Sequence, residues 1–205
     1  MKNRLWILVS LALSATFSHA QTFNREHAIQ RLTTPYSVVD AADQYHRATL
    51  DGTALSLSVF GELNTPDTYA LDQGPFAKSL TAVEITGESN SFLSYVTVLK
   101  GEKQLSGTMM RQLATQSLQE ILFLEGAKLN HRTTGHFGGN PAQHDSASFS
   151  QGGYQVVVDI ITSTTPDGLI SITCMHLKGD SVADNEVSGF LSGIKYKGAG
   201  FLEAN

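Results

Sequence analysis

The stretch 154–177, YQVVVDIITSTTPDGLISITCMHL, predicts two adjacent antiparallel strands in the middle of a β-sheet. From Tyr154 to Thr162 the side chains alternate between two faces with the two-residue period of a strand. Both faces carry apolar groups, with Asp159 among them, and this pattern is typical of a central strand that is covered on two sides. The turn signal Thr165-Pro166-Asp167-Gly168 then predicts that Leu169–Leu177 pairs back.

Three further strands are predicted on the N-terminal side of this pair. The segment Ser91–Lys100 is rich in β-branched and aromatic residues, which favour strands. Strands at 128–136 and 142–149 follow, separated by Gly138-Gly139-Asn140-Pro141. Consecutive strands joined by short turns imply antiparallel pairing.

Before Ser91 the sequence predicts one β-hairpin followed by an irregular segment. Tyr45–Leu50 and Ala54–Phe60 flank the tight-turn dipeptide Asp51-Gly52 and predict a β-hairpin. Residues 61–80 contain Pro66, Gly74 and Pro75 and are expected to form a loop with at most a short helix.

Two amphipathic helices are predicted. Thr108–Glu125 has apolar residues at helical spacing, with Thr108 able to cap its start and Gly126 able to end it. A second helix begins near Ser181, which has the capping-box spacing with Asp184. The apolar stripe of this helix comprises Ala183, Val187, Phe190, Leu191 and Ile194. Helices that flank a run of antiparallel strands predict the α+β class, an antiparallel β-sheet flanked by helices.

The order of these elements resembles the PsbP-like superfamily, which includes the photosystem II protein PsbP and periplasmic DcrB-like proteins. The resemblance covers about residues 91–196. It is carried by Phe137-Gly138-Gly139-Asn140-Pro141-Ala142, by the strand Gln155–Thr162, by Leu169-Ile170-Ser171-Ile172-Thr173-Cys174 and by Phe190-Leu191-Ser192-Gly193-Ile194. It implies an α/β/α sandwich and a small binding or assembly module rather than an enzyme, and it transfers no functional residue to this chain.

The N-terminus predicts export. Residues 1–20 have a basic start at Lys2 and Arg4, a short apolar run at Leu5–Leu13 and small residues before a cut after Ala20. We therefore expect a signal peptide at 1–20, an irregular leader at 21–44, one α+β domain at 45–196 and a flexible tail at 197–205. The predicted location is periplasmic or secreted, with no integral membrane segment after cleavage.

The net charge of the chain indicates which classes of partner it can bind. The formal net charge is −5, and loss of Lys2 and Arg4 makes it −7, which disfavours binding to nucleic acid. A protein partner of unknown identity is expected instead.

The single cysteine, Cys174, excludes an intramolecular disulfide. We interpret it as a small buried hydrophobic residue, with a dimer-forming or redox-active thiol as the alternative.

One stretch, His131–Asp145, is rich in possible metal ligands, since imidazole and carboxylate groups bind zinc or copper. His131 and His136 lie five residues apart in a strand and should point to opposite faces. His136 and His144 flank the predicted turn and could approach each other across a hairpin. The sequence therefore allows a metal site of His136, His144 and Asp145 without requiring one.

The sequence identifies no catalytic residue and implies no cofactor. Cys174 and His176 share a strand face and form a possible thiolate–imidazole pair, but Ile170 and Ile172 on the same face favour core packing. The leading hypothesis is therefore an exported, non-enzymatic binding or accessory protein of the bacterial cell envelope. The alternative is a metal-dependent enzyme or metal-binding protein that uses the three candidate ligands.

Overall fold

The computed structural model describes residues 45–50, 52–60, 62–63, 67–70, 80–88, 92–101 and 126–204, together with positions 108, 112, 115, 118–119 and 121–124. The predicted signal peptide at 1–20 and leader at 21–44 lie outside the described residues. Among the described residues, no helix has both the length and the apolar character to cross a membrane.

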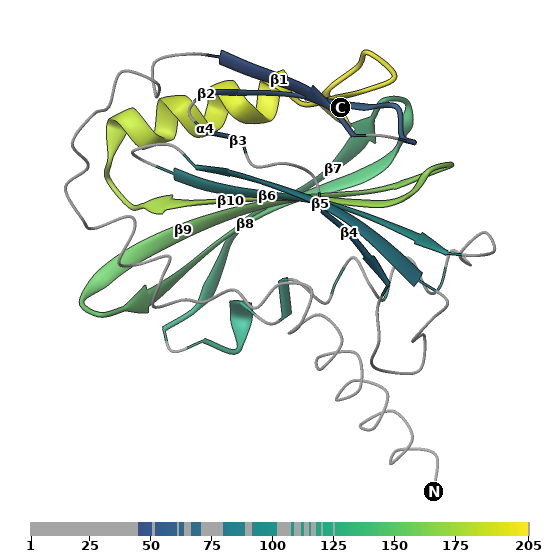
Figure 1. Cartoon of the computed structure of the whole chain (residues 1–205). Helices are drawn as coiled ribbons and strands as arrows, with labels where there is room; N and C mark the ends of the chain where they lie inside the picture. The colour runs from purple at the N-terminus through teal and green to yellow at the C-terminus, as the bar shows by residue number, and fades with distance from the viewer. Residues whose placement is uncertain are drawn as a thin grey trace, which may run out of the picture.

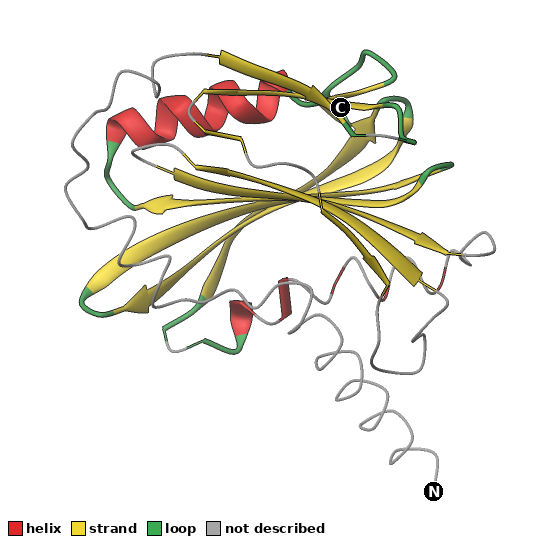
Figure 2. Ribbon diagram, in the orientation of Figure 1, coloured by secondary structure: helices red, strands yellow, loops and turns green. Residues whose placement is uncertain are grey.

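The centre of the fold is a large antiparallel sheet (Figures 1 and 2). Along the sheet the strand order is β12-β7-β8-β9-β10-β6-β5-β3, with β4 also paired to β5. The strands are β3 (Glu62–Leu63), β4 (Asp67–Ala70), β5 (Leu80–Glu88), β6 (Phe92–Gly101), β7 (Lys128–Phe137), β8 (Asn140–Gln151), β9 (Tyr154–Thr165), β10 (Gly168–Leu177) and β12 (Phe201–Glu203).

The prediction of a central β9–β10 pair is confirmed. Antiparallel register places Ile172 opposite Ile161 and Cys174 opposite Asp159. Both faces of β9 are buried over most of the strand because each face packs against its own apolar cluster. The strand continues three residues beyond the predicted end at Thr162.

One face of the large sheet is covered by helix α4 (Ser181–Gly193) and by a second, smaller sheet. This small sheet contains β1 (Tyr45–Thr49), β2 (Leu55–Phe60) and β11 (Lys195–Tyr196). The predicted β1–β2 hairpin is confirmed, but it belongs to a separate layer rather than to the central sheet. Figure 1 shows α4, β1 and β2 on the same side of the large sheet.

Helix α4 docks through the predicted apolar stripe. Ala183, Val187 and Phe190 are buried, and the Phe190 ring lies 5.5 Å from that of Phe92, centroid to centroid. The N-cap differs from the prediction, because Asp180, one residue before Ser181, accepts from the first free N–H groups of the helix. The carboxylate of Asp184 therefore makes a different contact, described below.

The opposite face of the large sheet packs against the segment predicted as the first helix. Its described positions 108, 112, 115, 118–119 and 121–122 are helical. Leu118 is buried in a cluster with Phe149, Val158 and Met175, and Ile121 packs against the same cluster. The last described helical position is Leu122, and Phe123 and Leu124 lie outside the helix, so the helix ends before the predicted end at Glu125. Gly126 adopts a left-handed φ of +66° in the turn that follows. The α+β class is thus confirmed.

Two predictions about irregular segments are wrong. Residues 61–80 were expected to form a loop, yet β3 and β4 lie there, and the unpredicted strand β5 begins at Leu80. The tail at 197–205 was expected to be flexible, yet β12 pairs with β7, with Phe201 opposite Phe137. Strands β3, β4 and β12 are only two to four residues long and depend on pairing with distant strands, so their own sequences give little strand signal.

Candidate functional site

A row of polar groups crosses the face of the large sheet that lies under α4. Asp159 sits in the otherwise apolar strand β9, and its neighbours in register are Ser146 on β8 and Cys174 on β10. Because side chains opposite each other in an antiparallel pair share a face, all three point toward α4. His144 and His176 lie on the same face, each two residues along its strand from Ser146 and Cys174 respectively.

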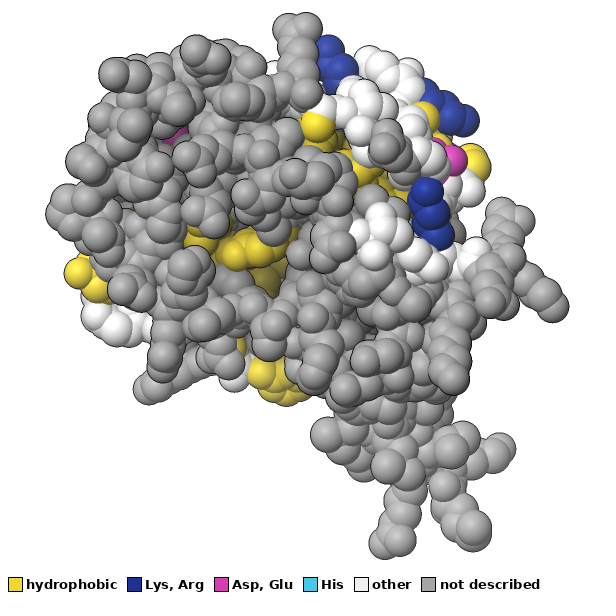
Figure 3. Space-filling model, viewed as in Figure 1, with side chains coloured by type: hydrophobic (Ala, Val, Ile, Leu, Met, Phe, Trp, Pro, Cys, Tyr) yellow, Lys and Arg dark blue, Asp and Glu magenta, His cyan; other side chains and the backbone are white. Residues whose placement is uncertain are grey.

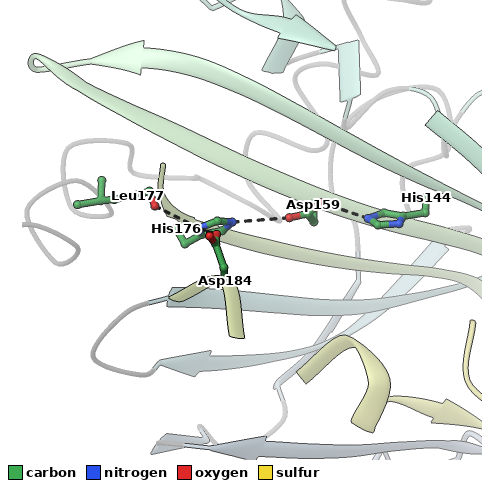
Figure 4. A network of polar contacts seen from close by, with 5 residues as sticks. All are labelled: His144, Asp159, His176, Leu177 and Asp184. Atoms are coloured by element: carbon green, nitrogen blue, oxygen red, sulfur yellow. Dashed lines mark hydrogen bonds and ion pairs between the residues drawn. The ribbon is translucent and has the colours of Figure 1, made fainter. Parts of the chain in front are cut away.

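Asp159 joins the two imidazoles (Figure 4). Nε2 of His144 lies 3.2 Å from Oδ1 of Asp159, and Nε2 of His176 lies 3.8 Å from Oδ2. On its other side, Nδ1 of His176 lies 3.2 Å from the carbonyl oxygen of Leu177 and 3.4 Å from Oδ1 of Asp184. The cluster His144–Asp159–His176–Asp184 therefore runs from β8 through β9 and β10 to the first turn of α4.

The surroundings of His176 favour its charged form. Both ring nitrogens face oxygen acceptors, and only the imidazolium carries a proton on each nitrogen. Burial lowers the pKa of His176, whose side chain is only 5% exposed, but the contacts with Asp159 and Asp184 outweigh burial and leave the pKa raised.

Asp159 is held in its ionised form by the same contacts. Burial raises the pKa of this carboxyl, but its interactions with His144, His176 and Ser146 outweigh that effect and place the pKa well below its usual range. The carboxylate is 14% exposed, so its charge is compensated by the two imidazoles more than by water. The cluster is an internally paired ionic network.

His144 also connects the cluster to the C-terminal segment. Its ring lies 5.8 Å from the ring of Phe201 on β12, in an edge-to-face arrangement. The strand that replaces the expected flexible tail therefore packs beside one end of the cluster.

The structure does not bring the three predicted metal ligands to one point. His136 lies opposite Pro141, and Asp145 lies opposite Arg132, so these side chains share one face of the sheet. His144 is adjacent to Asp145 in β8 and therefore points to the other face. One ion cannot bind all three side chains in this arrangement. In the described part of the chain, no group of three or more His, Cys, Asp or Glu side chains is placed to hold a metal.

Asp145 has its own partners on the face away from α4. The Arg132 guanidinium donates to its Oδ1 at 2.6 Å, and the Gln143 side-chain amide donates to Oδ2. The carboxylate is buried, whereas Arg132 is partly exposed. These contacts compensate the buried negative charge of Asp145, so its carboxylate serves the structural ion pair with Arg132.

Cys174 is buried, as predicted. Burial raises the pKa of its thiol well above the usual value, and the negative charge of Asp159 raises it further. The alternative of a thiolate–imidazole pair with His176 gains no support, because the His176 ring nitrogens face Asp159, Asp184 and Leu177.

Sequence reasoning did not assign a role to Asp159, the residue that connects the cluster. The signal was available, since a carboxylate in a strand with two apolar faces must be buried and must therefore be paired. The partners could not be named, because His144 and His176 lie 15 and 17 positions away and only the sheet register brings them close.

The comparisons with known proteins leave the family open. No protein-family model and no curated protein matches the chain. Among solved structures it is similar to LpqN of Mycobacterium tuberculosis, described as involved in cell envelope biogenesis, at 12% identity over 74% of this chain and 90% of that one, with a TM-score of 0.41.

Two further similar structures have other described roles. One is the Ran-binding protein Mog1p of Saccharomyces cerevisiae, at 12% identity over 75% of this chain and 96% of that one, with a TM-score of 0.40. The other is the T6SS immunity protein TplEi of Pseudomonas aeruginosa, at 11% identity over 71% of this chain and 55% of that one, with a TM-score of 0.40. Likenesses at this level assign no function, and the PsbP-like membership stays a prediction.

Proposed function

We propose that this chain is an exported, non-enzymatic binding or accessory protein of the bacterial cell envelope, retained in the periplasm or released. The export part of the proposal rests on residues 1–20, with their basic start, apolar run and small residues before Gln21.

The non-enzymatic part of the proposal rests on the polar cluster, because its side chains contact one another inside the protein. The ring nitrogens of His176 and the carboxylate oxygens of Asp159 are directed at other groups of the chain, and both side chains are largely buried. A catalytic base or metal ligand needs a nitrogen or oxygen that faces a substrate or an ion. The geometry therefore supports a structural role for this cluster.

The binding part is supported by apolar side chains at the surface. Among the described residues, the exposed large hydrophobic side chains are Leu122, Phe123, Leu129, Tyr154, Val182 and Leu202. Phe123 is 88% exposed, which is unusual for a phenylalanine, and exposed apolar groups are a common feature of protein contacts. Figure 3 shows hydrophobic side chains beside Lys and Arg at the upper right of one face.

The metal-dependent alternative gains no support from the geometry, because His136 and His144 lie on opposite faces of the sheet. We therefore put forward one function and leave metal binding as an untested prediction of the sequence.

Export is tested by expressing the full chain with a C-terminal tag in a bacterium and fractionating the culture. We expect the tagged protein in the periplasm or the medium, with Gln21 as its first residue. Leu8→Arg is the control, because a charge in the apolar run blocks export. Wild-type protein that remains in the cytoplasm with Met1 intact would overturn the proposed location.

Binding is tested in the same strain with a photo-crosslinking residue at position 123. The matched control places the same residue at Ser188, an exposed position on α4. We expect a discrete crosslinked species from position 123 that is absent from position 188. Identical patterns from both positions would count against a specific protein partner at this surface.

A further inference from the structure

We propose that His176 is a pH-sensitive latch that holds the N-terminal end of α4 against the large sheet and releases it when the imidazole loses a proton. The proposal stands on the position of His176 at the interface between β10 and α4 and does not depend on where the protein acts in the cell.

The contacts of His176 connect two separate elements to β10. Its Nε2 faces Asp159 on β9, and its Nδ1 faces Asp184 in the first turn of α4. A neutral imidazole carries one N–H, so it can satisfy one of these sides and presents a lone pair to the carboxylate on the other. Asp159 is far more buried than Asp184 and keeps the remaining N–H, so loss of the proton leaves a lone pair on Nδ1 facing Asp184. The attraction between β10 and α4 then becomes a repulsion.

The two carboxylates next to His176 favour its protonated form. Within the described residues, β9 contributes Asp159, α4 contributes Asp184, and His144 on β8 faces Asp159 from its far side. On β6, the residue in register with His176 is the apolar Phe92. The carboxylate of Asp180 at the start of α4 is committed to the N–H groups that it caps.

The rest of α4 has a different anchor. Val187 and Phe190 are buried in the apolar core, and Phe190 packs against Phe92 on the sheet. Deprotonation of His176 therefore loosens the first turn and the Lys178–Asp180 connection, while the second half of α4 stays docked. Such loosening uncovers Ala183, which is fully buried in the latched state.

The sign of the pH effect follows from the raised pKa of His176. A group whose pKa is higher in the folded state binds its proton more tightly there. Its stabilisation is complete below the unfolded imidazole pKa of about 6.5 and is lost as the pH rises through the folded pKa. The latch is thus closed in acid and opens toward alkaline pH.

The test is amide hydrogen exchange of α4 in the folded protein at about pH 6 and about pH 9, corrected for the intrinsic pH dependence of exchange. In the wild type we expect protection of the Asp184 and Asn185 amides to fall between the two pH values. Protection of the Phe190 amide should stay constant, because its anchor does not titrate.

Two variants separate the latch from general stability. Asp184→Asn removes the negative charge from the α4 side of the contact, at a position whose side chain is 58% exposed, so the fold should persist. Asp180→Asn removes a charge from the same helix end but keeps a capping side chain, because asparagine caps as well as aspartate. We expect Asp184→Asn to abolish the pH-dependent loss of protection and Asp180→Asn to retain it.

Either of two results would overturn the proposal. One is wild-type protection of the first turn that is the same at both pH values. The other is a pH-dependent loss of protection that is equally large in Asp184→Asn, since the contact would then contribute nothing to it.

Discussion

Replacement of Asp159 with Asn tests the ionic cluster most severely. The substitution keeps the shape of the side chain and one oxygen acceptor but removes the negative charge between His144 and His176. The new amide group is a donor, and wherever it faces an imidazole N–H it loses that contact altogether.

The expected cost follows from the burial of the partners. Removing one member of a buried ion pair costs about 3–5 kcal/mol, because the other charge is left uncompensated. His176 is 5% exposed, but it can escape part of that cost by losing its own proton. We therefore expect Asp159→Asn to lower the free energy of unfolding by about 2–4 kcal/mol near pH 7.

Urea denaturation followed by circular dichroism measures this change, with the slope of the transition as a check that both proteins unfold in the same way. Asp184→Asn is the matched control, because its exposed contact with His176 should contribute at most about 1 kcal/mol. A loss of less than about 1 kcal/mol in Asp159→Asn would refute the account, since a buried and paired carboxylate cannot be so dispensable.

Three other predictions test the packing around the cluster. Phe190→Ala should cost about 3–5 kcal/mol in urea denaturation, because it leaves a cavity under α4, and a cost below about 1 kcal/mol would contradict the docking of the helix. Gly138→Ala should destabilise the protein by at least about 1 kcal/mol more than Gly139→Ala, and equal costs would contradict the predicted clash. Both glycines have a positive φ, but only at 138 would the new Cβ lie 2.4 Å from the carbonyl oxygen of Tyr196. Cys174 should resist a thiol reagent in the folded protein and react at once in urea, whereas fast reaction without denaturant would show an accessible thiol.

The layers of the fold follow from local patterns. Alternation and turn residues at 154–177 predict β9, β10 and their pairing, and helical spacing predicts the α4 stripe. Strand β5 carries a local strand signal in the β-branched residues of LTAVEITGE, and our prediction missed it. By contrast, β12 is only three residues long and exists through its contact with β7.

In the candidate site, too, local sequence predicts some features, whereas others depend on the register between strands. A buried carboxylate at Asp159 follows from the sequence, because the strand around it is apolar on both faces. Its partners depend on the register between β8, β9 and β10, which brings His144 and His176 to either side of it. The expected grouping of His144 with His136 fails for the same reason, since the register and the alternation of the strand place them on opposite faces.

The most direct test of the account is the charge state of His176 in the folded protein. Nitrogen-15 NMR of the histidine rings distinguishes the imidazolium, with both nitrogens protonated, from the neutral tautomers. At about pH 6.5, where an unperturbed imidazole is half protonated, we predict that His176 is mostly imidazolium. A mostly neutral ring with a single protonated nitrogen would contradict the assignment of His176 as a charged bridge between the sheet and α4.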